Sequence, residues 1–497
     1  MPREEAISNA IKEFELQGYD LSGVVTNLAG EELQSHPIAV AAQGLREACG
    51  GEGSLPEALE AFAASLQAST SQPSDTDTGT AASSTTTGTT PPLVLSQEQY
   101  VIAHKGASMQ SLLEACRRLQ SQPDQLLKAL GLLQVLLGWL ETRDAFTEAQ
   151  GVELLHDLLR SDASSTHVKA AAAAVAEAAA RGVEETKCRL VDSGLVATLL
   201  ELLQAPGTPP AAAASTASTE GSGAAGTGAE QPPQEATAAA ATAAGAVPLE
   251  LVGAACGVLR AVTTADDERP PASKAFMHAR VLAKSHGAIR VLLGVLRRVP
   301  AAQEPATACR VLGTVRQVAA NEEICREFTD DGGVMACLQV LSECAAQRDV
   351  CRACLGALRQ LAHSDTVKRL LAAAGAVPLA VRCVDLHAGA DDVAEGALGL
   401  LGNMMLRQPE ICSQAAEAGV IDTVVEAMQR HPARAPVQRQ ACLLVRVMAA
   451  RNPELRPPFL ERGVEGLLRA AKVAHPAACR DVGAAALRDL GLDNYND

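Results

Sequence analysis

A glycine-marked motif recurs along the chain at nearly constant spacing. In each copy the glycine precedes a segment whose apolar residues follow the i, i+3, i+4 spacing of a helix. The glycines are Gly106, Gly151, Gly194, Gly287, Gly333, Gly375, Gly419 and Gly463. Their spacings are 45, 43, 93, 46, 42, 44 and 44 residues. A period of roughly 40 to 47 residues is typical of helical repeat proteins, so we expect stacked copies of one helical unit.

A second apolar segment follows most of these glycines by 22–26 residues. Two landmarks at fixed phase predict three helices per repeat. The glycine ends the first helix, where it can adopt a left-handed C-cap conformation. The second helix is amphipathic, and the third is apolar on more than one side. Hydrophobic residues make up 47% of the chain but aromatic residues only 2%, which favours close helix packing on Ala, Leu and Val.

The period and the three-helix unit resemble armadillo repeats. This resemblance implies an all-α, right-handed armadillo-type solenoid of about eight three-helix repeats, with an N-terminal helical arm. We place the repeats at residues 96–141, 142–182, 183–265, 266–320, 321–363, 364–407, 408–451 and 452–491. Three segments are similar to one branch of that family: EEAISNAIKEFELQGYDLSGVV near the N-terminus, LRAVTTADDERPP, and AALRDLG near the C-terminus.

Shifts in composition divide the chain further. We predict an acidic helical region at 1–66, a disordered linker at 67–95, repeats 1–3 (first part) at 96–203, a low-complexity disordered insertion at 204–247, the rest of repeat 3 and repeats 4–8 at 248–491, and a tail at 492–497. The insertion accounts for most of the excess length in the one long spacing. A longer loop is expected at DDERPP, because Pro270 and Pro271 cannot lie inside a helix.

Charge and cysteine usage narrow the choice of partner and compartment. The net charge is −16, and residues 1–100 hold 3 Lys or Arg against 14 Asp or Glu. Without a basic footprint we expect no nucleic-acid binding. No apolar run reaches the roughly 18 residues of a membrane span, and charges interrupt any signal peptide at residues 4–13. We therefore expect 14 reduced, mostly buried cysteines in a monomer of the cytoplasm, and also of the nucleus.

The armadillo resemblance also implies that third helices line a concave, peptide-binding groove. Nuclear-import receptors of this fold place Trp and Asn four residues apart there. The Trp positions here are Gly131, Ala174, Gly257, Gly313, Gly356, Gly399, Leu443 and Ala485. The Asn positions are Val135, Ala178, Ala261, Gln317, Gln360, Asn403, Val447 and Asp489. No Trp remains and only three positions keep an amide, so recognition of basic import signals is not expected.

The main candidate site is formed by the residues that directly precede the eight Asn positions. These residues are arginine in five of the last six repeats: Arg260, Arg316, Arg359, Arg446 and Arg488. In register, these side chains would form a basic stripe that attracts an acidic or polar partner segment. The predicted partner-binding residues are therefore Arg260, Arg316, Gln317, Arg359, Gln360, Asn403, Arg446 and Arg488. The alternative is that each arginine pairs with an Asp or Glu of the adjacent repeat and binds nothing.

The acidic N-terminal region has two interpretations. It folds back onto the arginine stripe and gates access, or it caps the exposed end of the first repeat, as solenoids require.

Two other groups of residues, a cysteine pair and a histidine pair, are interpreted as structural. Cys351 and Cys354 form a CxxC without a second pair at zinc-finger spacing, so core packing is favoured over metal or redox chemistry. His278 and His286 lack a flanking ligand set.

Three functions are compatible with these sequence features. The leading one is a non-enzymatic scaffold or adaptor that binds a protein segment in the groove. The second is a structural subunit that docks by its convex face into a larger assembly, and the third is a nuclear transport adaptor. No phosphate-binding loop, dinucleotide fingerprint or GxSxG nucleophile motif is present, so neither enzymatic activity nor a cofactor or metal is expected.

Overall fold

The computed structural model describes residues 35–68, 95–204, 248–269 and 272–496. These residues form helices and connecting loops and contain no β-strand. They fall into two compact units. Unit 1 holds residues up to 198 together with 265–273, and unit 2 holds 199–264 and 274 onward. Within these ranges no helix combines the length and apolarity needed to cross a bilayer.

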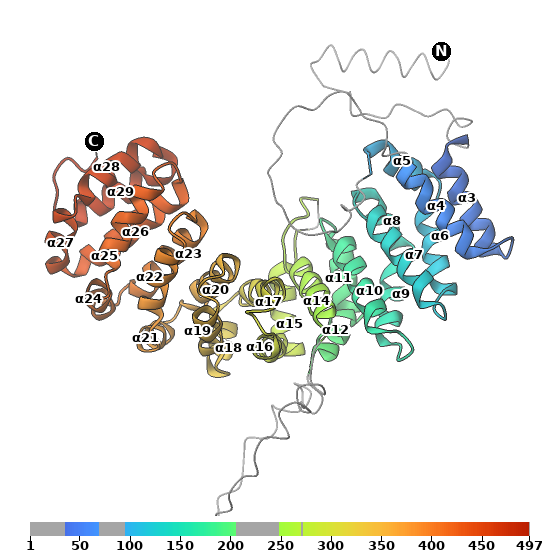
Figure 1. Ribbon diagram of the computed structural model, residues 1–497, viewed down its shortest axis with the longest axis horizontal. Coiled ribbons are helices and arrows are strands. Elements are labelled where there is room, and N and C mark those ends of the chain that lie inside the picture. Colours follow the sequence, from blue (N-terminus) through green and yellow to red (C-terminus); the bar gives the residue numbers. More distant parts are fainter. Residues whose placement is uncertain (1–34, 69–94, 205–247, 270–271, 497) are drawn as a thin grey trace, which may run out of the picture. The chain divides into compact units, whose positions relative to one another are not determined.

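The described part of unit 1 begins with two helices, which the first repeats follow. The helices are α3 (Pro37–Gly50), α4 (Leu55–Ala68), α5 (Gln97–Lys105), α6 (Ser108–Arg118), α7 (Pro123–Leu136), α8 (Leu140–Glu148), α9 (Gly151–Arg160), α10 (Thr166–Ala180) and α11 (Glu184–Asp192). Helix α3 packs on α4, α5 and α6, and α4 packs on α7 (Figure 1). The side chains of Ile38, Leu45 and Phe62 are fully buried in this packing. The boundary between the units falls within α12 (Leu195–Leu203).

Unit 2 continues the same three-helix pattern to the C-terminus. Its helices are α14 (Leu249–Val262), α15 (Ala275–His286), α16 (Ala288–Arg298), α17 (Pro305–Val318), α18 (Glu322–Asp330), α19 (Gly333–Glu343), α20 (Arg348–Leu361), α21 (Asp365–Ala373), α22 (Ala376–Leu386), α23 (Asp391–Met405), α24 (Pro409–Glu417), α25 (Val420–Arg430), α26 (Ala435–Arg451), the 3-10 turn η2 (Pro453–Leu455), α27 (Arg456–Glu461), α28 (Val464–Ala474) and α29 (Pro476–Asp489).

The helices of unit 2 stack in layers, repeat upon repeat. The third helices α14, α17, α20, α23, α26 and α29 each contact the next one along the chain. The second helices α16, α19, α22, α25 and α28 form a second layer in the same order (Figure 1). Leu312, Leu355 and Leu398, one on each of three successive third helices, are fully buried. Burying a leucine contributes roughly 2 kcal/mol, so the stacked apolar faces hold the repeats together.

The landmark glycines follow the predicted C-cap geometry at only some positions. Gly194, Gly287, Gly375, Gly419 and Gly463 adopt positive φ between first and second helices. In the other three repeats the left-handed residue is a neighbour: Ala107, Gln150 or Gly332. Gly151 and Gly333 instead begin the second helix, where a Cβ atom would lie 2.3 Å from the ring of Phe146 or Phe328. These two glycines therefore make room for an aromatic side chain of the first helix.

The loop after α14 is non-helical over 265–269, as expected, but it is more than a connection. It packs within unit 1 at the start of α11, whose N-cap residue Val183 makes no side-chain cap. An Asp267 carboxylate oxygen accepts a hydrogen bond from the Glu184 N–H (2.8 Å), and Asp266 accepts one from the Gly182 N–H (3.1 Å). Asp266 also pairs with the buried Lys187. The loop thus supplies from a distant segment the anionic cap that α11 lacks.

The prediction of about eight three-helix repeats is confirmed, with α5–α7 as the first repeat and α27–α29 as the last. The segments 1–34, 69–94 and 205–247 lie outside the described residues. They include most of the predicted linker and of the predicted insertion. Helix α4 ends at Ala68, one residue beyond the predicted start of the linker, because Leu59, Phe62 and Leu66 keep its apolar face buried to its last turn.

Candidate functional site

The candidate site lies on what we call the third-helix surface, formed by α14, α17, α20, α23, α26 and α29 of unit 2. Each of three arginines reaches the glycine at the import-receptor Trp position of the next repeat. Measured to the place a Cβ would take, the Nη1 atom of Arg260 lies 3.8 Å from Gly313, that of Arg316 lies 3.4 Å from Gly356, and that of Arg359 lies 2.6 Å from Gly399. The missing side chain in each following repeat thus leaves space for a guanidinium group.

The five stripe arginines differ in their ion pairs. In the part of unit 2 that the structure describes, Arg260, Arg316 and Arg359 have no carboxylate partner. Arg446 and Arg488 share one: their guanidinium groups lie 3.4 and 3.0 Å from Asp489. The alternative, in which each arginine pairs with an acid of the adjacent repeat, therefore describes Arg446 alone, because Asp489 belongs to the same helix as Arg488. Three successive guanidinium groups keep their charge uncompensated.

The three amides are used inside the stack. Gln317 donates a hydrogen bond to the carbonyl of Thr263 (2.7 Å), Gln360 donates to Ala319 (2.8 Å) and Asn403 donates to Arg359 (3.1 Å). Each acceptor lies at the C-terminal end of the preceding third helix, where carbonyls lack intrahelical partners. These side chains fasten neighbouring repeats together, and this role differs from the predicted one of holding a bound peptide.

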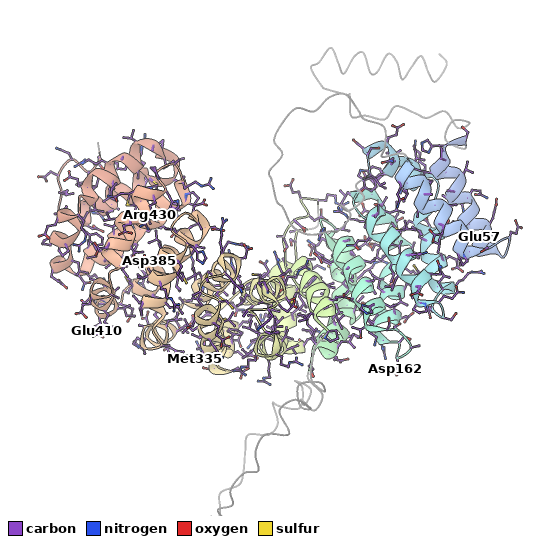
Figure 2. All side chains as sticks on the ribbon, viewed as in Figure 1. Glu57, Asp162, Met335, Asp385, Glu410 and Arg430 are labelled. Carbon is purple, nitrogen blue, oxygen red and sulfur yellow. The ribbon has the colours of Figure 1, made fainter. Side chains whose placement is uncertain are left out.

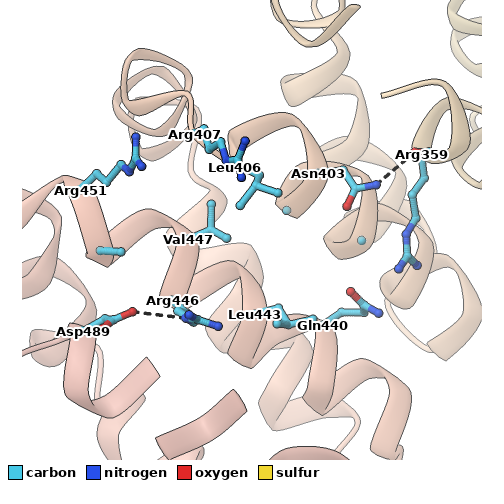
Figure 3. A pocket seen from close by; sticks show the side chains of 13 residues that line it. Arg359, Asn403, Leu406, Arg407, Gln440, Leu443, Arg446, Val447, Arg451 and Asp489 are labelled. Carbon is cyan, nitrogen blue, oxygen red and sulfur yellow. Dashed lines mark hydrogen bonds and ion pairs between the residues drawn. The ribbon is translucent and has the colours of Figure 1, made fainter. Parts of the chain in front are cut away.

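A pocket of about 430 Å³ opens on this surface where α20, α23, α26 and α29 meet (Figure 3). It brings together Arg359, Asn403 and Arg446 from the predicted set. Arg260, Arg316, Gln317, Gln360 and Arg488 lie outside it. The charged groups in its lining are four arginines and one carboxylate: Arg359, Arg407, Arg446, Arg451 and Asp489. The apolar part of the lining consists of Leu406, Leu443, Val447 and Ala450. A surface of this kind suits an anionic group attached to an apolar one.

Four polar residues of the pocket were not among the predicted site residues: Arg407, Gln440, Arg451 and Asp489. Arg451 is the last residue of α26 and Arg407 follows α23, so both lie beyond the four-residue frame used to locate the site. Arg407 adopts a left-handed backbone conformation with φ of 64°, which is uncommon outside glycine and asparagine. Each of the two arginines lies one helical turn after an Asn position, Asn403 or Val447, so extending the comparison of the repeats by one turn identifies both. Gln440 lies one turn before Leu443, and no repeated sequence pattern marks it as a site residue.

Both cysteines of the CxxC, and His278 of the histidine pair, are buried in the core. Cys351 and Cys354 are both buried in α20, and burial raises the pKa of the Cys354 thiol well above its usual range. Hydrogen bonds with Cys383 and His387 lower the pKa of Cys351 to about 7. His278 is buried, with Nδ1 2.9 Å from the carbonyl oxygen of Val262. All 14 cysteines are free thiols, and 12 are buried.

The second-helix layer offers a different surface. Its exposed large apolar side chains are isolated, as with Met335 on α19, which is 49% exposed (Figure 2). Leu386 at the end of α22 is likewise exposed. Exposed acids such as Glu57, Asp162 and Glu410 are distributed over the units (Figure 2). Single exposed apolar residues are normal on soluble proteins and do not by themselves indicate a docking patch.

The chain is similar in sequence to proteins named armadillo repeat-containing protein 6. It is 25% identical to the protein from Homo sapiens over 425 residues, which cover 82% of this chain and 71% of that protein. The proteins from Pongo abelii and Drosophila melanogaster match at 26% and 30% identity. Each of those two matches covers 32% of this chain and 33% of the relative. No family model matches the chain.

Solved structures show the same fold. An engineered protein superposes with a TM-score of 0.63 at 18% identity, covering 91% of this chain and 88% of its own. A structure from work on a phosphorylation switch that controls the interaction between cadherin and β-catenin superposes with a TM-score of 0.57 at 14% identity. That superposition covers 91% of this chain and 79% of the other. At such identities the likeness concerns the fold alone.

Proposed function

Because this chain is an armadillo-type repeat protein, similar over most of its length to armadillo repeat-containing protein 6, we propose that it acts as a non-enzymatic protein-interaction scaffold. Its third-helix surface in unit 2 binds an acidic or polar segment of a partner protein. The observation that carries the proposal is the row formed by Arg260, Arg316 and Arg359, whose guanidinium groups reach the next repeat without a carboxylate partner. In a chain with net charge −16, such a row attracts carboxylates and repels basic segments.

The chemistry of the pocket supports binding rather than catalysis. Its basic groups are guanidinium groups, which stay protonated at physiological pH and cannot act as a general base. Its one carboxylate, Asp489, is paired with two arginines. Planar guanidinium groups instead recognise carboxylates in a two-pronged geometry, which adds specificity to charge attraction.

Docking through the second-helix layer is the second candidate. Its exposed large apolar residues, Met335, Leu386 and Val473, lie on three different helices, whereas the third-helix surface combines a pocket with uncompensated charge. A nuclear transport adaptor is less well supported. Recognition of basic signals requires aromatic slots and free amides, and here the Trp positions hold small or aliphatic residues while the amides bond to neighbouring repeats.

We place the protein in the cytoplasm and also in the nucleus. Twelve of its 14 free cysteines are buried, and a stack packed on free thiols suits a reducing compartment. Imaging of the tagged full-length chain in cells tests the location, and accumulation in the secretory pathway would contradict it.

The binding surface is tested with a triple variant of the full-length chain, Arg260→Glu, Arg316→Glu and Arg359→Glu. The matched control changes Arg280, Arg369 and Arg382 to Glu, because these exposed arginines lie on α15, α21 and α22, away from the third helices. Binding of a labelled poly-glutamate peptide is measured by fluorescence anisotropy, and partner recovery by quantitative affinity purification.

We expect the stripe variant to bind the peptide at least about tenfold more weakly than the control, a factor that corresponds to roughly 1.4 kcal/mol. The wild-type affinity should also fall as salt is added. Partners recovered with the wild type and the control should be lost from the stripe variant. Equal losses in the two variants would reject the third-helix surface as the binding site, and circular dichroism of both variants verifies that they are folded.

A further inference from the structure

The row of arginines has one gap, and the pocket opens at that gap. Along the third helices, Arg260, Arg316 and Arg359 each cover the glycine of the next repeat. On α23 the equivalent position is Gly402, with open space where its Cβ would be. Leu443, the residue that a side chain at 402 would cover, is left half-buried in the pocket lining. A single missing side chain in a regular array therefore creates the cavity.

Part of the exposed surface of the pocket is apolar, and charged side chains surround it. Leu406 is 48% exposed, and it lines the pocket with Leu443 and Val447 (Figure 3). Leaving these side chains in water costs free energy that a bound apolar group would recover. The volume of about 430 Å³ lies in the lower part of the roughly 300–1,000 Å³ range of ligand pockets. It suits one bulky side chain with a short length of its backbone.

The guanidinium groups around this apolar area are available to a ligand. Arg407 and Arg451 are exposed, and like Arg359 they have no carboxylate partner in the described part of unit 2. Arg446 is held by Asp489. Three uncompensated positive charges around one apolar patch disfavour a lysine or arginine of the partner and favour carboxylates on both sides of the apolar group.

Gln440 adds a polar group inside the pocket. Its side chain is only 8% exposed, and it makes no hydrogen bond with any residue that the structure describes. The amide atoms keep contact with solvent in the pocket, so they are open to hydrogen bonds from a ligand. A primary amide both donates and accepts, so it can satisfy one N–H and one C=O of an extended backbone. Gln440 therefore fits a bound peptide better than a small anion.

We propose that the gap pocket, by which we mean the cavity between Gly402 and Leu443, is the anchor subsite of this surface. It takes one bulky aliphatic or aromatic side chain of the partner segment, with acidic residues before and after it. The anchor packs on Leu406 and Leu443, the flanking carboxylates meet Arg359 on one side and Arg407 and Arg451 on the other, and Gln440 bonds to the backbone. This inference rests on the proposed function, because it defines which acidic segments the third-helix surface accepts.

The substitution Gly402→Arg tests the inference by completing the arginine row and filling the gap. It is compatible with the fold, because no atom lies within 4 Å of the added Cβ. It also raises the positive charge of the surface, so charge attraction alone predicts tighter binding of acidic peptides. The matched control is Gly466→Arg, an exposed glycine on α28 that also has open space around its Cβ and lies outside the pocket.

A displayed library of random peptides is selected on the full-length wild type and on both variants. We expect the wild type and Gly466→Arg to enrich peptides with a bulky apolar residue flanked on both sides by Asp or Glu. Gly402→Arg should reduce that enrichment at least about tenfold. A tenfold loss corresponds to roughly 1.4 kcal/mol, which is less than the burial of one bulky apolar side chain contributes. A labelled peptide from the selection should lose affinity to a similar extent when its anchor is changed to Ala.

The other outcomes separate the two proposals. Enrichment of acidic peptides without an apolar anchor, equal on wild type and Gly402→Arg, would overturn the anchor subsite and leave the arginine surface standing. The absence of any acidic preference on the wild type would overturn both. Anchored peptides that bind Gly402→Arg as well as they bind the wild type would place the anchor elsewhere on the protein.

Discussion

Single glycines and arginines determine what the third-helix surface can offer. Where import receptors carry tryptophan, Gly313, Gly356 and Gly399 leave room for a guanidinium group from the preceding repeat. A Cβ at residue 399 would lie 2.6 Å from Nη1 of Arg359, so alanine there would displace the arginine. The two residue types act as a pair, one providing the charge and the other the space.

Asp267 is the residue for which we expect the clearest pH dependence. Its side chain is 7% exposed, and hydrogen bonds from Arg269 and from the Glu184 N–H lower its pKa to about 2. In an unfolded chain the pKa of aspartate is about 3.9. Its contribution to the free energy of unfolding is therefore complete above about pH 4 and is lost as the pH falls toward 2.

We expect Asp267→Asn to lower the free energy of unfolding of unit 1 by roughly 1 kcal/mol at pH 7, because α11 loses an anionic cap. The deficit should shrink below pH 4, where the wild type loses the same charge. Urea unfolding followed by fluorescence measures it, since Trp139 is the one tryptophan of the chain and stacks on Tyr100 in unit 1. A deficit that stays constant from pH 7 to pH 3 would mean that the carboxylate charge plays no part.

At this scale the sequence was informative about the arginines but not about their partners. A 43-residue interval between Arg316 and Arg359 was enough to predict one shared surface. The pairing of Arg446 and Arg488 with Asp489, and the guanidinium groups of Arg407 and Arg451 at the pocket, depend on side-chain directions at helix ends. Periodicity specifies which face a residue occupies and leaves these directions open.

Between elements, amide side chains join successive third helices. Gln317, Gln360 and Asn403 each donate to a carbonyl at the end of the preceding helix, so one repeat completes the hydrogen bonding of its neighbour. The repeated Gly-to-helix pattern predicted these helices well, because their apolar faces are set by a 3.6-residue period. The amides were predicted as ligand contacts, since sequence alone does not show which carbonyls come within their reach.

Replacing Gln360 by Leu tests this role. We expect the change to lower the free energy of unfolding by about 1 to 2 kcal/mol, because the Ala319 carbonyl loses its amide donor and keeps only the weak donor Cys325 Sγ, while apolar volume is retained. The control is Gln339→Leu on α19, an exposed side chain that bonds only to Glu343 of its own helix, and it should have an effect below roughly 0.5 kcal/mol. Chemical denaturation followed by circular dichroism compares the two. Equal effects would contradict a role in fastening the repeats.

Across the whole molecule, repetition made the fold predictable. The three-helix pattern occurs in eight copies, so a helix that is ambiguous in one copy can be assigned by comparison with the others. The division into two units was not predicted, because residues 265–269 return to unit 1 through the contacts of Asp266, Asp267 and Arg269. Such a return leaves no trace in periodicity. The gating hypothesis for the acidic N-terminal region involves residues 1–34, which lie outside the described chain.

Removing residues 1–92 separates the cap from the gate. Helices α3 and α4 pack on α6 and α7, so the deletion exposes an apolar end of unit 1. We expect a melting temperature several degrees lower in the transition reported by Trp139, with unchanged affinity for an acidic peptide. A gate would instead give tighter binding after the deletion. The full-length chain, measured under the same conditions, is the reference.

On the third-helix surface of unit 2, guanidinium groups recur at the spacing of the repeats, except at Gly402. An acidic chain whose charged groups recur at the distance between neighbouring repeats could occupy several positions at once, and each further contact would form at high effective concentration. Affinity would then rise steeply with the number of correctly spaced groups and not with total charge. Because the row is interrupted only at Gly402, this position distinguishes one register of a bound segment from the others.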